Sequence, residues 1–412
     1  SAASDVYKRQ TDMLRKQLFT IALCFGFSVA FSQEVCRPQT MDELLQLIEQ
    51  NNKDLKAGAS QTEAFKWQAR TENNLPDPEV TYSHLWGNKE GMGFTGEFIA
   101  SQSFNFPTLY AQRNKLNESR FRSLDAQYAV SRQQILLQAQ QACLDLIYLN
   151  QLQTLLDERL ANAEALSRFY ASQLEKGATN IIETNKIDLE LLNARNEARQ
   201  NEAARQAKLE ELAALNGGVP VAFVDTVYRS AWEYPSDFEA FRVEALASLP
   251  EMQALQSDQA AASRSVAVSK QQWLPNLTLG YRMNPSSGGD RYNGVLVGIS
   301  IPLFSNRGKV KQAKAERFYA ETKVQSFTDT ETAALRQVWV QAGKLKASAD
   351  EYASVLRQQN NIALLNKAIQ AGQISMIEYF VNVTTFYQSM QNYLQLQNEY
   401  QKAMAQLYRF RL

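Results

Sequence analysis

The chain has 412 residues, with 43 Lys and Arg side chains against 43 Asp and Glu, a single His and three Cys. A formal charge of zero argues against the basic surface that binding to nucleic acid requires. One His and three Cys leave little material for a transition-metal site or a His-based catalytic triad. We therefore expect no cofactor, no metal and no nucleic-acid partner.

The N-terminal residues resemble an export signal. Residues 13–32 combine a short basic start, an apolar run from Leu18 to Val29 and small residues at Ala30 and Ser32, the pattern that signal peptidase recognises. The apolar run is shorter than the roughly 20 residues of a membrane-spanning helix, which is the alternative interpretation. We predict a cleaved signal peptide over 13–32, preceded by an artefactual extension over 1–12.

The cysteines predict no disulfide. Cys24 leaves with the predicted signal, while Cys36 lies in the N-terminal tail and Cys143 lies in a helical block, where burial as a small apolar residue is expected. Neither Cys24 nor Cys36 follows the small residue that precedes a lipidated cysteine, so the sequence also disfavours a lipid anchor.

The chain is predicted to consist of two similar halves. The segments 108–219 and 303–412 contain no proline and are rich in helix-forming residues. Short motifs recur in the same order in both halves. The matched pairs are 74–82 with 273–281, 104–107 with 299–302, 119–121 with 316–318, and 177–183 with 372–378. We predict two structural repeats, residues 33–219 and 220–412, each with a β-hairpin and two long helices.

Alternating side chains predict the two hairpins, at 77–106 and 276–302. Each strand has one apolar face and a length that suits a tilted transmembrane strand of about 9–11 residues. The alternative is a soluble sheet packed on helices. The residues predicted to face lipid are Tyr82, Trp86, Phe94, Phe98, Leu279, Tyr281, Val297 and Ile299. His84 lies among them, where a structural or rim position is favoured over metal ligation.

Four long helices are predicted, over 108–176, 180–216, 308–371 and 375–410. A helix of roughly 70 residues would be about 100 Å long, more than a compact globule of this size needs. Four strands cannot close a single-chain barrel, which starts at about eight strands, and an open edge in lipid leaves backbone groups unpaired. Strands in a membrane would therefore require an oligomer, and a trimer would supply twelve.

These features together resemble the TolC-type outer-membrane efflux protein family. The resemblance rests on the signal peptide, the duplicated order of elements, the Leu-Pro pairs that open the strands, Pro107 and Pro302, and the two Gly-x-x-[Asn/Ser]-x-Ile-Glu turns. It implies a mainly α-helical homotrimer with a twelve-stranded transmembrane β-barrel continued by a periplasmic α-barrel, in the outer membrane of a Gram-negative bacterium. It also implies a region at mid-length to which residues 215–247 contribute.

The resemblance further implies a channel with no catalytic centre. Such a channel passively conducts substrates that an inner-membrane transporter, of RND type, delivers through a periplasmic adaptor. The alternative that the sequence leaves open is a secreted helical coiled-coil scaffolding protein with a soluble sheet. Neither interpretation makes the chain an enzyme.

The two Gly-containing turns carry the candidate site residues. By resemblance, the turns are the periplasmic tips that contact the adaptor; the alternative is a turn without a partner, since Gly commonly ends helices. The tip residues are Gly177, Ala178, Thr179, Asn180, Gly372, Gln373, Ile374 and Ser375.

Glu378 follows the second turn and falls where the family has an acidic residue of the closed constriction. Glu183 is its repeat mate. The alternative is a solvated carboxylate that is stabilised by the helix dipole. The second acidic position of the family is Val381 here, which favours a partly hydrophobic closure.

Overall fold

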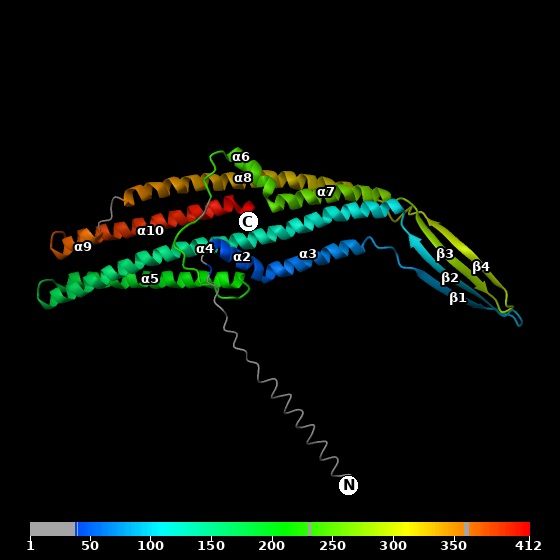
Figure 1. The fold of residues 1–412 in the computed structure, drawn as a ribbon, viewed down its shortest axis with the longest axis horizontal. Coiled ribbons are helices and arrows are strands. Elements are labelled where there is room, and N and C mark those ends of the chain that lie inside the picture. Colours follow the sequence, from blue (N-terminus) through cyan, green and yellow to red (C-terminus); the bar gives the residue numbers. More distant parts are fainter. Residues whose placement is uncertain (1–37, 39, 230–231, 358–361) are drawn as a thin grey trace, which may run out of the picture.

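The computed structural model describes residues 38, 40–229, 232–357 and 362–412. The predicted extension 1–12, the predicted signal 13–32, Cys24 and Cys36 therefore lie outside the described residues. Figure 1 shows an elongated protein in which long helices run side by side and a β-sheet projects beyond their ends.

Two helices run along most of the helical body. α4 spans Pro107–Glu175, and its first position is proline, whose missing N–H has no partner to lose there. At 1.5 Å per residue, its 69 residues measure about 100 Å. α8 spans Lys309–Leu356. These two helices are the frame on which the shorter helices pack (Figure 1).

Near the sheet, the helices lie in the order α3, α4, α7, α8, where α3 is Lys53–Thr71 and α7 is Pro250–Gln271. Toward the other end, the order is α5, α4, α10, α8, where α5 is Ile181–Leu215 and α10 is Met376–Leu407. Each level of the body thus has four helices across. α5 and α3 form one edge of this layer, and α8 forms the other.

Short elements thicken the middle of the layer. α2 (Met41–Asn51), α6 (Phe238–Ser248) and the 3-10 turn Arg409–Arg411 bury apolar side chains there against the long helices. A polar cluster also joins three helices at mid-length: the Asp145 carboxylate of α4 lies 3.2 Å from Lys208 Nζ of α5 and 2.9 Å from Lys402 Nζ of α10. The Asn398 amide donates to the same carboxylate at 2.9 Å.

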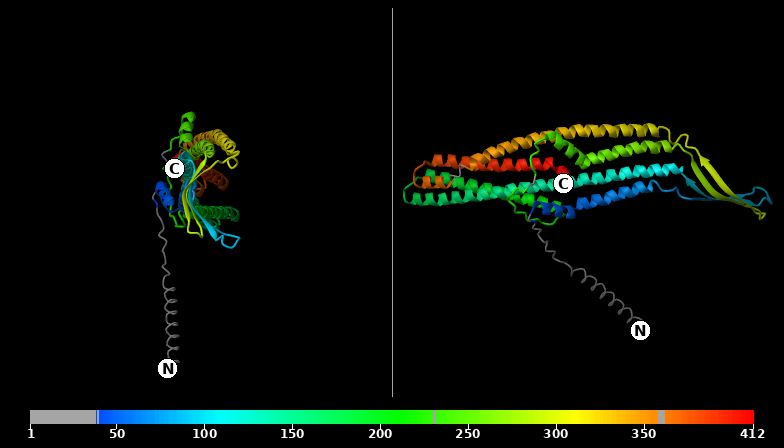
Figure 2. Two further views of the ribbon diagram at one scale, coloured as in Figure 1. Left: turned by 90° about the vertical axis from the view of Figure 1, so that its right-hand side faces the viewer. Right: turned by 45° about the horizontal axis from the view of Figure 1, so that its top comes forward.

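The sheet has four antiparallel strands in chain order. They are β1 (Glu79–Trp86), β2 (Phe94–Phe104), β3 (Asn276–Pro285) and β4 (Arg291–Ser300). β2 pairs with β3, with Ala100 opposite Tyr281, so the sheet joins the two halves of the chain. β1 and β4 are its two edges. No helix of the described chain lies along either face of the sheet (Figures 1 and 2).

The prediction of one helix over 308–371 is wrong. α8 ends at Leu356, and a separate helix, α9, spans Ile362–Gln370. α9 packs Ile362 and buried Ile369 with side chains of α10, and this packing is what a single straight helix would not provide.

Candidate functional site

One face of the sheet is almost entirely apolar. The registers place Tyr82 opposite Phe98, Trp86 opposite Phe94, and Leu279 opposite Val297. Seven of the eight residues predicted to face lipid are exposed. Their exposed fractions are 56% for Tyr82, 79% for Trp86, 37% for Phe94, 51% for Leu279, 44% for Tyr281, 70% for Val297 and 65% for Ile299. Phe98 is half-buried.

The single histidine is part of this apolar face. His84 stacks on Phe94 with ring centroids 4.7 Å apart and meets the edge of Trp86 at 4.6 Å. Its Nδ1 lies 3.1 Å from the Tyr82 hydroxyl. Within the described residues, no group of three His, Cys, Asp or Glu side chains could hold a metal ion. His84 is therefore placed in an aromatic cluster.

The opposite face of the sheet carries mostly small and polar side chains, with Leu85, Ile99, Tyr292 and Leu296 as larger exceptions. Glu97 forms an ion pair with Arg282 across β2 and β3, and the Ser103 and Thr278 hydroxyls lie 3.2 Å apart. Thr81, Ser83 and Ser300 share this face, since they alternate with the apolar positions. The sheet is thus almost entirely apolar on one side and mainly polar or small on the other.

The two glycine turns are built in the same way. Gly177 has φ +71° and Gly372 has φ +69°, a conformation that glycine adopts without strain. After each helix end, two backbone hydrogen bonds close the turn: from Gly177 to Leu174 and from Ala178 to Gln173 in one, and from Gly372 to Ile369 and from Gln373 to Ala368 in the other. These are Schellman motifs, which satisfy the last carbonyl groups of a helix.

In both turns, the residue three positions after the glycine caps the next helix. The Asn180 side chain accepts a hydrogen bond from the Glu183 N–H at 3.0 Å, and the Ser375 hydroxyl accepts one from the Glu378 N–H at 3.2 Å. Caps of this kind satisfy free N–H groups of the first helical turn. The two turns therefore hold Glu183 and Glu378 at equivalent helix positions.

The environments of these two carboxylates differ. Glu378 Oε2 accepts hydrogen bonds from the backbone N–H and the hydroxyl of Ser375, at 2.9 and 3.0 Å, and these bonds hold the pKa of Glu378 below its ordinary value. Glu183 instead lies beside Lys186, with 3.4 Å between Oε1 and Nζ. Its Oε2 is buried and has no hydrogen-bond partner in the part of the chain that the structure describes.

The structure brings the two turns together. Thr179 and Glu183 of one turn and Gly372 and Ile374 of the other line a single open groove of about 350 Å³, with Tyr170 beneath it. On the helices that follow, Ile182 and Val381 are exposed, with fractions of 63% and 60%. The same end of the molecule therefore presents glycine turns, carboxylates and apolar side chains.

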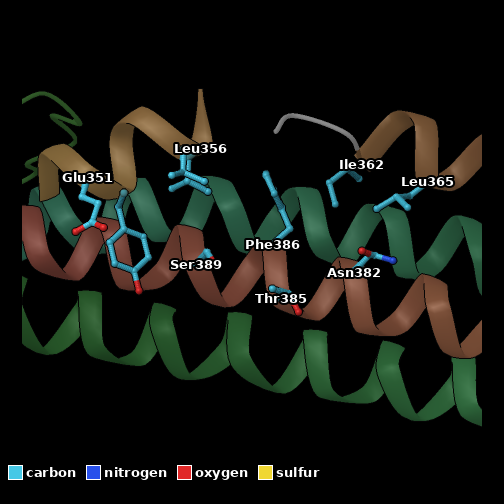
Figure 3. A pocket seen from close by; sticks show the side chains of 10 residues that line it. Glu351, Leu356, Ile362, Leu365, Asn382, Thr385, Phe386 and Ser389 are labelled. Atoms are coloured by element: carbon cyan, nitrogen blue, oxygen red, sulfur yellow. The ribbon is translucent and has the colours of Figure 1, made fainter. Parts of the chain in front are cut away.

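A second groove, which the sequence did not indicate, lies between α10 and the α8–α9 junction (Figure 3). It has a volume of about 450 Å³. Leu356, Ile362 and Leu365 line one side, while Phe386 and Ser389 reach it from α10. The groove exists because the helix predicted over 308–371 is divided, so no signal in the helical periodicity predicts it.

Two further observations bear on the site. Cys143 is fully buried, and burial raises the pKa of its thiol. This cysteine is therefore an unreactive residue of the hydrophobic core. Among the described helices, none has a stretch of apolar residues long enough to cross a bilayer.

Comparison with known proteins is consistent with this geometry. Residues 242–410 match the sequence model of the outer membrane efflux protein family. No curated protein matches the chain. The predicted resemblance to TolC-type outer-membrane efflux proteins is thus confirmed in the second half of the chain.

Solved structures extend the likeness to the whole fold. The chain superposes on CusC with a TM-score of 0.75 and 14% identity, covering 90% of this chain and 91% of CusC. The CmeC outer membrane channel of Campylobacter jejuni superposes with a TM-score of 0.72 and 15% identity, covering 90% of this chain and 85% of CmeC. The outer membrane protein VceC of Vibrio cholerae superposes with a TM-score of 0.70 and 15% identity, covering 90% of this chain and 95% of VceC. At these identities, the likeness establishes the fold.

Proposed function

We propose that this chain is one subunit of an outer-membrane channel in a Gram-negative tripartite efflux system. Three copies form a passive conduit that extends into the periplasm. An inner-membrane pump of RND type and a periplasmic adaptor deliver its substrates. The chain performs no catalysis in this proposal.

The uncovered apolar face of the sheet is the observation that carries the proposal. A β-sheet in water buries its apolar face, yet Trp86, Val295 and Val297 are each at least 70% exposed in a single subunit. Lipid is the environment that suits such a face. Hydrocarbon solvates apolar side chains, and the antiparallel ladder supplies hydrogen bonds to the backbone groups between paired strands.

The open edges of the layer support closure by three copies. β1 and β4 each have an unpaired side, and lipid penalises unpaired backbone groups, so the edges must pair with other copies. Four strands and four helices at each level give twelve of each in a trimer. Pairing β4 of one subunit with β1 of the next is a head-to-tail contact, which closes into a ring. The polar face then lines the lumen.

The helical end supports a periplasmic role. α4 alone is about 100 Å long, so the end with the two glycine turns lies far from the sheet. We propose that residues 177–180 and 372–375 contact the adaptor there, and that Glu378 and Glu183 contribute to a constriction near the axis. The turns are closed by backbone hydrogen bonds and lie side by side, which suits a docking surface.

The test is localisation and assembly of the full chain. We expect it in the outer-membrane fraction, as a trimer that separates into monomers only when the sample is heated before electrophoresis. A monomer that stays soluble without detergent would overturn the proposal and would favour the secreted scaffolding protein.

A further inference from the structure

The corner between β4 and α8 exposes apolar side chains at the base of the sheet. Ile301, Leu303 and Phe304 are 63%, 62% and 84% exposed. The equivalent corner in the first half is closed, because α4 begins directly at Pro107 and Leu109 is only 3% exposed. The second half of the chain therefore keeps a hydrophobic corner in solvent that the first half does not.

A run of basic side chains follows this corner. There is no acidic residue between Asp290 and Glu316. Within the described chain, none of the basic residues in the run pairs with a carboxylate. They are Arg307, Lys309, Lys311 and Lys314, and all four are exposed.

The position of these cations in the fold is unfavourable without an external anion. α8 starts at Lys309 and has no acidic residue in its first turn, so the cations lie at the positive end of the helix dipole. Lys311 and Lys314 are about one turn apart and are both exposed, whereas Ala313 between them is buried. Their charge is thus directed outward, and the helix does not neutralise it.

The corner is continuous with the apolar face of the sheet. Ile301 extends the alternation of Val297 and Ile299, and the chain then turns from the sheet into the helices (Figure 1). If the sheet spans a membrane, this corner is where hydrocarbon ends and the lipid headgroups begin. Apolar side chains next to Lys and Arg are typical of segments that bind a membrane surface.

We propose that residues 301–314 are a membrane-surface anchor that binds anionic phospholipid headgroups. Ile301, Leu303 and Phe304 enter the acyl boundary on the helical side of the bilayer, and the four cations bind headgroup phosphates. The proposal rests on the proposed function, because it requires the sheet to lie in the membrane. It assigns to the second repeat a lipid contact that the first repeat lacks.

The test is lipid retention by the purified full chain. Native mass spectrometry counts phosphatidylglycerol and phosphatidylcholine bound after the protein is mixed with equal amounts of both. One cation near an anionic surface changes a binding constant by roughly fivefold. We therefore expect wild type to prefer phosphatidylglycerol by at least about fivefold, and the preference to fall in high salt.

The test variant replaces all four cations: Arg307→Gln, Lys309→Gln, Lys311→Gln and Lys314→Gln. It should retain the two lipids about equally. The matched control removes four exposed cations from the helical body, which no ion pair engages in the described chain: Lys53→Gln, Lys56→Gln, Arg199→Gln and Lys344→Gln. The control should keep the preference of wild type.

Three outcomes would overturn the anchor. They are no lipid preference in wild type, an equal loss in test and control variants, and a loss of trimer without a change in lipid preference, which would assign the corner to a second copy of the chain. Flotation of wild type with vesicles separates this failure from failure of the proposed function. Protein that floats without a lipid preference removes the anchor and leaves the channel intact.

Discussion

Ser375 and Glu378 hold each other at the start of α10. The Ser375 hydroxyl accepts a hydrogen bond from the Glu378 N–H, and the Glu378 carboxylate accepts one from the Ser375 N–H, which together form a capping box. In α5, Asn180 caps the helix, but its partner Glu183 lies beside Lys186. The two turns are alike in backbone and differ in how their carboxylates are used.

Replacing Ser375 tests the capping box. Ser375→Ala removes the acceptor for the Glu378 N–H and should destabilise the first turn of α10 by about 1 kcal/mol. Amide hydrogen exchange should accelerate at residues 378 and 379, whose N–H groups bond to Ser375. Thr384→Ala, at an exposed position about two turns further along the same helix, should leave this exchange unchanged. Unchanged exchange in Ser375→Ala would mean that the turn is held by other contacts.

The polar cluster around Asp145 predicts a loss of stability in acid. Burial alone would raise the pKa of Asp145, but hydrogen bonds from Asn398, Lys402 and Lys208 outweigh burial, and the pKa is lowered. The unfolded chain therefore takes up the proton more readily than the folded one. The stabilisation is present above the ordinary Asp pKa of about 4 and is lost as the pH falls through the lowered value.

Asp145→Asn should reproduce this loss at neutral pH. The substitution removes the carboxylate charge that accepts hydrogen bonds from the two lysines, and it should lower the free energy of unfolding by about 1.5–3 kcal/mol. Thermal unfolding followed by circular dichroism should show a smaller difference between pH 7 and pH 3 in Asp145→Asn than in wild type. Asp350→Asn, at a 68% exposed side chain paired with Lys346, is the control and should behave as wild type. If both variants lose the same stability between pH 7 and pH 3, groups other than Asp145 cause the loss of stability in acid.

The sheet predicts tolerance of charge on one face only. Leu279→Arg or Val297→Arg should cost on the order of 2–4 kcal/mol if these side chains face mid-bilayer. Thr278→Arg and Ser300→Arg, on the opposite face, should be tolerated better. Trimer yield in outer membranes measures the difference. Equal yields from both faces would show that the strands are not in a bilayer.

Local patterns in the sequence predict most of the elements. β1 to β4 lie within the two ranges of alternating side chains, because a strand with one apolar face repeats every second residue. Gly177 and Gly372 end helices because only glycine adopts their positive φ cheaply. These features depend on neighbours in the chain.

Features that depend on distant contacts could not be predicted. The separate helix α9 packs Ile362 and Ile369 with side chains of α10, and helical periodicity does not encode this packing. The buried Glu183 Oε2 results from the meeting of two turns that are far apart in sequence. The sequence left the role of Glu378 undecided. Its capping box with Ser375 is a local contact, and the Ser-x-x-Glu spacing was the signal that could have indicated it.

The constriction proposed at Glu378 can be tested because a glutamine preserves the cap. Glutamine at this position completes a capping box as glutamate does. Glu378→Gln therefore removes the charge and preserves the turn. In a trimer whose tips converge, three copies of Glu378 would approach the axis, and close carboxylates attract multivalent cations. The charge of Glu183 is partly offset by Lys186 and would be screened over a Debye length of about 8 Å.

We therefore expect the closed channel to be cation-selective in a planar bilayer and to be blocked by multivalent cations from the side of the turns. Glu378→Gln should weaken this block more than Glu183→Gln, because it removes a ring of three charges that no cation in the subunit neutralises among the described residues. If Glu378→Gln keeps the block and conductance of wild type, the carboxylate serves only the capping box. Exposed apolar residues such as Val381 would then form the constriction.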